Sequence, residues 1–378
     1  MYLFLSNEFK IIFFISLIMS IIIKLLLRFR NNVIRLAPFL ERAFQQNRNK
    51  NLKLMIMRRI IILLVAIVLL VGCKKESAPL KIGYSDWPGW VAWDIAISKG
   101  WFKEEGVNVE FSWFEYSPSM DAFATGQIDA VTITNGDALV TGATGAANSM
   151  ILVSDFSNGN DMIVAAPGIN SVAELKGKKI GIEVGFVEHL LLDEALKSAG
   201  LTEKDVTLVN VVTNQTPQTL ASGQVDAIAA WQPNSGQALK AVPGSKAIYT
   251  SANVPGLIYD CLAVSPTSLN NRRADWEKVV KVWYRVVDFL NNPANKAEAL
   301  KIMSSRSGVT PQEYAEFMKG VHFLTKAEAL KVLEKGDSFQ SIYGSSKTVD
   351  KFNVENKIYK TSQNVNSYID PTIMTNLK

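Results

Sequence analysis

The chain has 378 residues, 48% of them hydrophobic, and carries a formal net charge of +5 at neutral pH. This length and composition exclude a disordered chain and favour two compact lobes. Residues 1–73 contain 11 of the 40 Lys and Arg residues but only 2 of the 35 Asp and Glu residues. Residues 74–378 therefore carry a formal net charge of −4. The excess positive charge therefore belongs to an N-terminal targeting segment, and nucleic acid is not expected as a partner.

Residues 57–73 have the order of a bacterial lipoprotein signal. Met57-Arg58-Arg59 is positively charged, Ile60–Leu70 is apolar, and Leu70-Val71-Gly72-Cys73 matches the lipobox, whose cysteine is acylated. The apolar run is shorter than the roughly 20 residues that a membrane-spanning helix needs. The sequence therefore predicts a signal peptide at 55–73, lipidation at Cys73 and a tether at 74–79. The alternative is a transmembrane helix with an incidental cysteine.

The segment before this signal fits it poorly. Ile11–Leu27 is a second hydrophobic run, and a basic, polar stretch follows it. We expect residues 1–54 to be an over-extended N-terminus, with translation starting at Met55 or Met57, and a genuine membrane segment is the alternative. Cys261 is the only other cysteine. With Cys73 lipidated it has no disulfide partner, so we expect a small buried side chain.

Residues 80–114 read as one βαβ unit. Lys81–Tyr84 is a short strand, Asp86–Trp90 has the Pro-Gly chemistry of a turn, and a helix starts at Val91 and stops at Gly100. The alternating apolar residues of Val107–Phe111 then predict a second strand. In open α/β sheets, ligands bind beyond the carboxyl ends of strands, so the Asp86–Trp90 loop is a candidate ligand site.

The same residues carry a family resemblance. The order of this unit, with "SKGWFKEEGV" and the later "GQIDA", resembles the solute-binding proteins of ABC importers in the nitrate, sulfonate and taurine group. Relatives of that group bind pyrimidine precursors of thiamine. The resemblance covers Leu80–Ser304 and implies a bilobed α/β periplasmic-binding-protein-like type II fold, with two Rossmann-like lobes joined by a two-strand hinge. It also implies a small-molecule solute, an ABC permease with its ATPase as partners, and a monomer without cofactor or metal.

The rest of the chain predicts how the lobes are divided. A second α/β unit starts near Ser171, and its Gly223–Ala227 (GQVDA) echoes Gly126–Ala130 (GQIDA), which indicates two similar lobes. We expect crossings at Val164–Gly168 and Asp260–Pro266, so that lobe 1 comprises 80–166 and 265–378 and lobe 2 comprises 167–264. Four helices are expected between residues 274 and 333. The tail from Thr348 is polar and poorly patterned.

Polar and aromatic side chains follow the expected strands and form the candidate ligand site. They are Asp86, Trp87, Trp90, Asn135, Asp137, Asp155, Asn158, Phe186, Glu188, Trp231 and Gln232. The tryptophans have packing as an alternative role, and Asp86, Asn135, Asp137 and Glu188 have helix capping.

The charge of this set indicates the kind of ligand. In the resembled sulfonate and nitrate binders, the loop matching Val184–Phe186 presents a small hydroxyl residue at a helix N-terminus, whereas this chain has Phe186 and then Glu188. No Lys or Arg follows an expected strand. We therefore expect a cationic or neutral nitrogen compound that stacks on indole rings and bonds to carboxylates. The alternative is an anion of the nitrate, sulfonate or taurine type.

Two other functions remain open at this stage. One is an enzyme of the pyrimidine-precursor type, but the chain has only two histidines, His189 and His322, and lacks the Gx(4)GK[ST], HExxH, CxxC and GxSxG motifs. The other is a sensor that docks on a membrane receptor. We expect a lipid-anchored binding protein at the cell membrane surface or in the periplasm, with no bond made or broken.

Overall fold

The computed structural model describes Arg59 and residues 77–377. The expected signal peptide, Cys73 and the segment 1–54 lie outside these residues, apart from Arg59. Within the described part of the chain, no helix has both the length and the apolar character to cross a bilayer.

The first lobe is built on a six-stranded mixed sheet in the order β11-β4-β10-β3-β1-β2. β1 pairs in parallel with β2 and β3, while β10 runs antiparallel between β3 and β4. β11 adds an antiparallel edge next to β4. The strands are β1 (Leu80–Tyr84), β2 (Val109–Trp113), β3 (Ala130–Thr134), β4 (Ser149–Ser157), β10 (Tyr259–Val264) and β11 (Val321–Phe323).

The second lobe repeats this plan on a five-stranded sheet in the order β7-β6-β8-β5-β9. β6 pairs in parallel with β7 and β8, and β5 runs antiparallel between β8 and β9. β5 therefore takes the position that β10 has in the first lobe. The strands are β5 (Met162–Ala165), β6 (Lys179–Ile182), β7 (Thr207–Asn210), β8 (Ala227–Ala230) and β9 (Lys246–Thr250).

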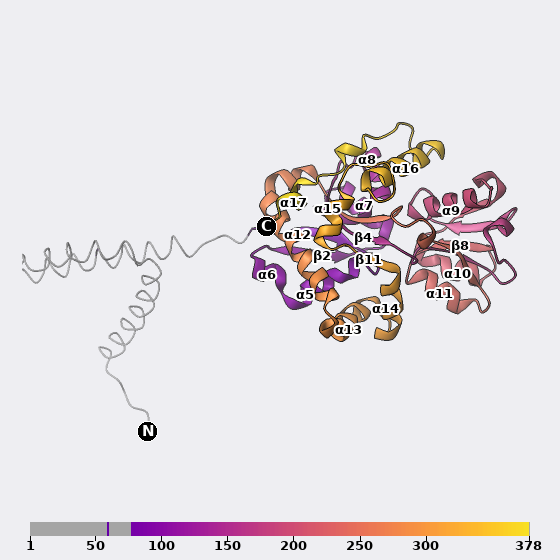
Figure 1. The fold of residues 1–378 in the computed structure, drawn as a ribbon, viewed down its shortest axis with the longest axis horizontal. Helices are drawn as coiled ribbons and strands as arrows, with labels where there is room; N and C mark the ends of the chain where they lie inside the picture. The colour runs from indigo at the N-terminus through magenta and orange to yellow at the C-terminus, as the bar shows by residue number, and fades with distance from the viewer. Residues whose placement is uncertain (1–58, 60–76, 378) are drawn as a thin grey trace, which may run out of the picture. The chain divides into compact units, whose positions relative to one another are not determined.

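Helices cover both sheets, and Figure 1 shows the second lobe beside the larger first lobe. The first lobe has α5 (Trp93–Lys99), α6 (Trp101–Glu105), α7 (Tyr116–Ala124) and α8 (Asn135–Ala143), and the second has α9 (Val187–Ser198), α10 (Thr216–Ala221) and α11 (Asn234–Ala241). The chain then adds α12 (Pro266–Asn291), α13 (Lys296–Ser307), α14 (Pro311–Phe317), α15 (Lys326–Val332), α16 (Ile342–Glu355) and α17 (Thr372–Asn376). α12 and α13 pack on α5, and α16 packs on α8, so the C-terminal region completes the first lobe.

The echoed pentapeptides have the same role in both lobes. Gly126 and Gly223 each have φ +71°, a conformation that favours glycine, where a helix ends and the chain turns toward a strand. The carboxylate of Asp129 accepts the backbone N–H of Lys81 at 2.9 Å, and that of Asp226 accepts the N–H of Lys179 at 2.8 Å. Each aspartate thus fixes the start of the neighbouring parallel strand, β1 or β6.

The expected lobe boundaries are wrong. The chain passes between the sheets at residues 158–161 and 251–258, not at Val164–Gly168 and Asp260–Pro266. β5 pairs only with second-lobe strands among the described residues, and β10 pairs with β3 and β4 of the first lobe. The Pro167-Gly168 signal ends β5 within the second lobe, whereas the polar stretch before β5 makes the crossing.

The polar tail from Thr348 contributes to the core, because α16 buries Val349 and Phe352 at 2% exposure each. His322 lies in β11. The helix-capping alternative for Asn135 and Asp137 is wrong. α8 is capped by the Thr134 hydroxyl, which accepts the N–H of Asp137 at 3.1 Å, so neither Asn135 nor Asp137 is the cap.

Candidate functional site

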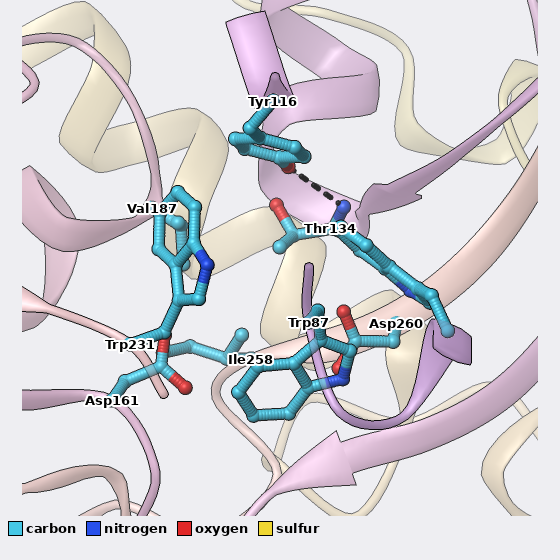
Figure 2. A pocket seen from close by; sticks show the side chains of 9 residues that line it. Trp87, Tyr116, Thr134, Asp161, Val187, Trp231, Ile258 and Asp260 are labelled. Carbon is cyan, nitrogen blue, oxygen red and sulfur yellow. Dashed lines mark hydrogen bonds between the residues drawn. The ribbon is translucent and has the colours of Figure 1, made fainter. Parts of the chain in front are cut away.

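A narrow cavity, with room for about one water molecule, lies where the two lobes meet. Figure 2 shows Trp231, Val187 and Asp161 facing Thr134, Trp87 and Asp260, with Tyr116 at one end. The first lobe supplies its lining from β1, α7, β3 and β10, and the second from α9 and the end of β8. The lining residues are Trp87, Trp90, Tyr116, Thr134, Asp161, Val187, Trp231, Ile258 and Asp260.

Aromatic rings form much of the wall. Trp90 stacks on Tyr116 with ring centroids 5.4 Å apart, and Tyr116 meets Trp231 edge to face at 5.1 Å. The indole N–H of Trp87 donates to the Asp155 carboxylate at 2.9 Å. The indole N–H of Trp90, which is only 3% exposed, has no hydrogen-bond partner. The wall therefore offers π faces and one unused donor.

The loop after β1 holds two of these rings because of its Pro-Gly sequence. A Cβ added to Gly89 would lie 2.4 Å from both an Asp155 oxygen and the Trp87 indole nitrogen, so only glycine fits there. The Tyr314 hydroxyl of α14 donates to the carbonyl of Pro88 at 2.9 Å. The C-terminal helices thus fix the loop that carries Trp87 and Trp90.

Two buried carboxyl pairs border the cavity. Asp161 and Asp260 line it at 3% and 2% exposure. Glu188 lies close enough to Asp161, and Asp260 close enough to Asp155, for the charge of one acid to raise the pKa of the other. Both oxygens of Glu188, Oδ2 of Asp161 and Oδ2 of Asp260 have no hydrogen-bond partner, so the acids of each pair disfavour each other's ionised form.

The pKa values follow from this burial. Burial raises the pKa of Asp161 to about 6, although hydrogen bonding to Ser157 opposes the rise. Burial and the charge of Asp161 raise the pKa of Glu188 well above its usual range. Burial and the charge of Asp155 do the same for the pKa of Asp260.

A second narrow cavity of similar size adjoins the first and shares Thr134, Val187 and Ile258 with it. Its acid is Asp137, which accepts the Tyr116 hydroxyl at 2.6 Å. Burial raises the pKa of Asp137 to about 7, although hydrogen bonds from Tyr116, Thr134 and the Val187 backbone oppose the rise. Phe186, which is half-buried, lines this neighbouring cavity and lies edge-on to Tyr116 at 6.5 Å.

Asp86 bridges the lobes and does not line either of these cavities. Its two oxygens accept the Trp231 indole N–H and the Asn234 amide N–H, each at 2.9 Å. Burial raises its pKa to about 6, and these two bonds oppose the rise. We call this contact the Asp86 bridge. The two lobes are thus held together directly, by protein atoms, beside the cavity.

The structure brings some predicted site residues together and separates others. Trp87, Trp90 and Trp231 line the cavity, Asp155 and Glu188 are the inner members of the carboxyl pairs, and Asp137 and Phe186 line the neighbouring cavity. Asn135 also lines the neighbouring cavity, but its amide donates to the Ser345 and Ser346 hydroxyls and accepts the Tyr259 N–H. Gln232 accepts the N–H of Gly236, and Asn158 is exposed; neither lines a cavity.

Sequence reasoning missed six lining residues: Tyr116, Thr134, Asp161, Val187, Ile258 and Asp260. One of them carried a usable signal. Asp260 is an acid inside a run of otherwise apolar or aromatic strand residues, all buried, and such an acid seldom stays buried without a role. Asp161 lay at the end of a polar loop and was not distinguished from its neighbours.

This arrangement is suited to a compact molecule that donates hydrogen bonds. Among the described residues, no Lys, Arg or His lines either cavity. The described side chains include no group of three or more His, Cys, Asp and Glu placed to hold a metal ion. The unpartnered carboxyl oxygens accept N–H or O–H groups, and the indoles offer faces for stacking a planar or cationic group.

Solved structures with the same architecture identify the fold. The alkanesulfonate-binding protein from Xanthomonas axonopodis pv. citri aligns with a TM-score of 0.65 at 18% identity, over 78% of this chain and 99% of that one. The periplasmic nitrate-binding protein from Synechocystis PCC 6803 aligns with a TM-score of 0.63 at 13% identity, over 80% of this chain and 88% of that one. The chain thus has the bilobed periplasmic-binding-protein-like α/β fold that its sequence resemblance implied.

The chain belongs to the NMT1-like family, whose model matches residues 73–304. A Brucella abortus (strain 2308) protein, provisionally named a binding protein, is 33% identical over 172 residues, or 45% of this chain and 53% of its own length. An Escherichia coli (strain K12) protein, provisionally named an aliphatic sulfonates-binding protein, is 31% identical over 48% of this chain and 60% of its own length. The chain therefore spans about half the length of the Brucella relative.

Proposed function

We propose that this protein is the extracytoplasmic substrate-binding component of an ABC importer and captures a small nitrogen compound, cationic or neutral, between its lobes. The observation that carries the proposal is the cavity between the lobes, where buried carboxyls and indoles meet without a basic side chain. A Brachyspira hyodysenteriae relative named as an ABC transporter periplasmic binding protein supports the transport role. It is 22% identical over 81% of this chain and 95% of its own length.

The chemistry of the cavity supports a nitrogen compound over the anions in the names of several relatives. A buried sulfonate or nitrate requires cationic or N–H donors around its oxygens. Here the charged groups nearest the cavity are Asp155, Asp161, Glu188 and Asp260, which repel an anion when ionised. The same groups attract an ammonium, amidinium or guanidinium ion. An anion is the alternative ligand, and its support comes from the names of the relatives alone.

Capture occurs by closure of the lobes, with no bond made or broken. The two crossings lie side by side, since the Ser157 and Ser251 hydroxyls are 2.7 Å apart and the Gly159 N–H donates to Ser251 at 2.7 Å. Two short adjacent segments between rigid sheets are the usual build of a hinge. Opening there breaks the Asp86 bridge and gives the solute access to the indoles. The monomer hands the solute to the permease, which the ATPase drives.

The protein acts from the outer face of a membrane, tethered through lipid on Cys73. This part of the proposal comes from the lipobox sequence alone, because Cys73 lies outside the described residues. The Cys73→Ser variant is expected to leave the membrane fraction and appear in the soluble extracytoplasmic fraction, because acyl chains anchor by burial of about 0.8 kcal/mol per CH₂. Fractionation with an antibody measures this. Retention of the variant in the membrane argues for an upstream hydrophobic anchor.

A ligand screen tests the proposed solute class. Detergent-solubilised full-length protein is mixed with guanidinium, acetamidinium, methylammonium, urea, nitrate, taurine or an alkanesulfonate at low millimolar concentration, and its melting temperature is followed. A ligand that binds only the native state raises that temperature. We expect one or more of the nitrogen compounds to do so, with the anions inactive. A shift with nitrate, taurine or sulfonate alone refutes the proposed solute class.

A further inference from the structure

The cavity wall presents buried polar atoms of both kinds without partners. Oδ2 of Asp161 and Oδ2 of Asp260 have no hydrogen-bond donor, and neither oxygen of Glu188 has one. The indole N–H of Trp90 has no acceptor. All four side chains are at least 97% buried. Buried polar groups are nearly always paired, so this set points to the groups that a ligand supplies.

The protein itself explains the other polar atoms near the cavity. The Tyr116 hydroxyl donates to Asp137 and accepts the Thr134 N–H at 3.1 Å. The Trp87 and Trp231 indoles donate to Asp155 and Asp86. The polar atoms without partners on residues that line the cavity are therefore Oδ2 of Asp161 and Oδ2 of Asp260, as acceptors, and the Trp90 indole nitrogen, as a donor.

From this pattern we propose that the ligand is a planar cation that carries at least two N–H groups and one hydrogen-bond acceptor. The N–H groups bond to Asp161 and Asp260, and the acceptor receives the Trp90 indole N–H. An amidinium or guanidinium joined to a carbonyl or to a ring nitrogen has this combination. The inference rests on the proposed function, because it specifies which nitrogen compound the same cavity takes.

The pattern also excludes a quaternary ammonium ion, although a cage of Trp87, Trp90, Tyr116 and Trp231 would otherwise suit one. Such an ion has no N–H group, so it would leave the Asp161 and Asp260 oxygens buried and unpaired. A site built to bond N–H groups rejects an analogue that lacks them by a large factor, because its own polar atoms then stay unsatisfied.

Three probes that differ in one feature each test the inference. Guanylurea has N–H groups and a carbonyl acceptor, guanidinium has N–H groups alone, and tetramethylammonium has neither. Their dissociation constants are measured by calorimetry on the detergent-solubilised full-length protein and on its Trp90→Phe variant. We expect guanylurea to bind most tightly, guanidinium about tenfold more weakly, and tetramethylammonium not to bind.

The variant isolates the role of the indole N–H. Trp90→Phe keeps a ring to stack on Tyr116 but loses the indole N–H. It is therefore expected to raise the dissociation constant of guanylurea about tenfold and to change that of guanidinium by no more than a factor of about two. Trp113→Phe is the matched control, because Trp113 is 37% exposed and lies outside the cavity. It is expected to change neither constant.

The outcomes separate the inference from the function that it rests on. Tetramethylammonium binding as tightly as guanidinium overturns the inference and leaves a cation-binding protein in place. If Trp90→Phe reduces the affinities for guanylurea and guanidinium equally, the proposed bond from the Trp90 indole N–H to an acceptor on the ligand is wrong. If none of the three cations binds, the inference is wrong. Binding of urea alone would then still support a nitrogen compound as the solute. Binding of sulfonate or nitrate alone would overturn the proposed function as well.

Discussion

Asp86 and Asp161 lie in the same interlobe cleft, and each has a pKa raised by burial to about 6, yet their surroundings differ. Both oxygens of Asp86 are occupied by donors of the opposite lobe. Asp161 has one oxygen without any donor, on a cavity wall. A buried acid whose partners belong to the protein stabilises an arrangement of the chain, whereas one without partners is suited to a ligand. The two aspartates thus predict different mutant phenotypes.

The largest expected effect is the loss of affinity in Asp161→Asn. Removing one member of a buried charge pair costs 2–5 kcal/mol in binding, so affinity for the cation found in the screen should fall about a hundredfold or more. The free energy of unfolding of the ligand-free protein should stay unchanged or rise, since an unpaired buried charge is removed. Calorimetry and urea denaturation measure the two quantities. Unchanged affinity combined with lower stability of the free protein would make Asp161 a structural residue.

Asp86→Asn should act on closure more than on contact with the ligand. An amide can keep only one of the two bonds as acceptor, so the closed form loses about 1–2 kcal/mol relative to the open form. The radius of gyration of the ligand-free protein, measured by small-angle X-ray scattering, should increase. Affinity should fall about tenfold, because part of the binding energy is then used to close the lobes. The same scattering curve for Asp161→Asn and Asp86→Asn would contradict the distinction drawn between them.

The pH dependence of stability sharpens the comparison further. An acid whose folded pKa is raised binds more protons in the folded than in the unfolded state, so stability falls as pH rises through the interval between the two pKa values. For Asp161 this interval extends from about 4 to about 6, and for Asp137 to about 7. Among the groups around them, Asp155, Glu188 and Asp260 also have raised pKa values and extend the trend upward. The charge of Glu183 raises the pKa of Asp137, whereas the charge of His322 lowers the pKa of Asp155.

The ligand-free protein should therefore melt a few degrees lower at pH 8 than at pH 5, and a bound cation should remove most of the difference. Thermal unfolding between pH 5 and pH 8, with and without the cation, measures the pH dependence of the melting temperature and the effect of the cation on it. In Asp161→Asn the slope should be shallower than in the wild-type protein. A melting temperature that rises steadily between these pH values would contradict the raised pKa values of Asp161 and Asp137.

Sequence reasoning reached the fold and part of the site for identifiable reasons. Strands and helices near Asp86–Gly100 follow from local periodicity and turn chemistry, and the echo of Gly126–Ala130 in Gly223–Ala227 follows from a role that each lobe repeats. The predicted positions of the crossings are wrong because Pro167-Gly168 marks the end of a strand but carries no information on which sheet that strand joins. Pairing of β5 and β10 in the opposite lobes is long-range, so no local pattern records it.

The site was harder to predict for the same reason. Whether an acid is partnered depends on residues far away in sequence, as with Asp86 and Trp231. Asp86, Asn135 and Gln232 have the same kind of chemistry and the same strand-end position as Asp161 and Asp260, but their polar atoms have protein partners. Glu188 and Asp155 were predicted as contacts, but they lie behind Asp161 and Asp260, which became visible only with the fold.

The smallest expected effect concerns two partnered acids far from the cleft. Asp129→Ala and Asp226→Ala each remove a carboxylate that accepts an N–H near the start of a parallel strand, so each should lower the free energy of unfolding by about 1 kcal/mol. Because the two sites lie in different lobes and share no partner, the double variant should lose the sum, and ligand affinity should not change. Urea denaturation measures the additivity. If Asp226→Ala also reduced affinity about as much as Asp161→Asn, then partners within the protein would not separate structural acids from ligand-binding ones, because the Asp226 carboxylate has a protein partner and lines neither cavity.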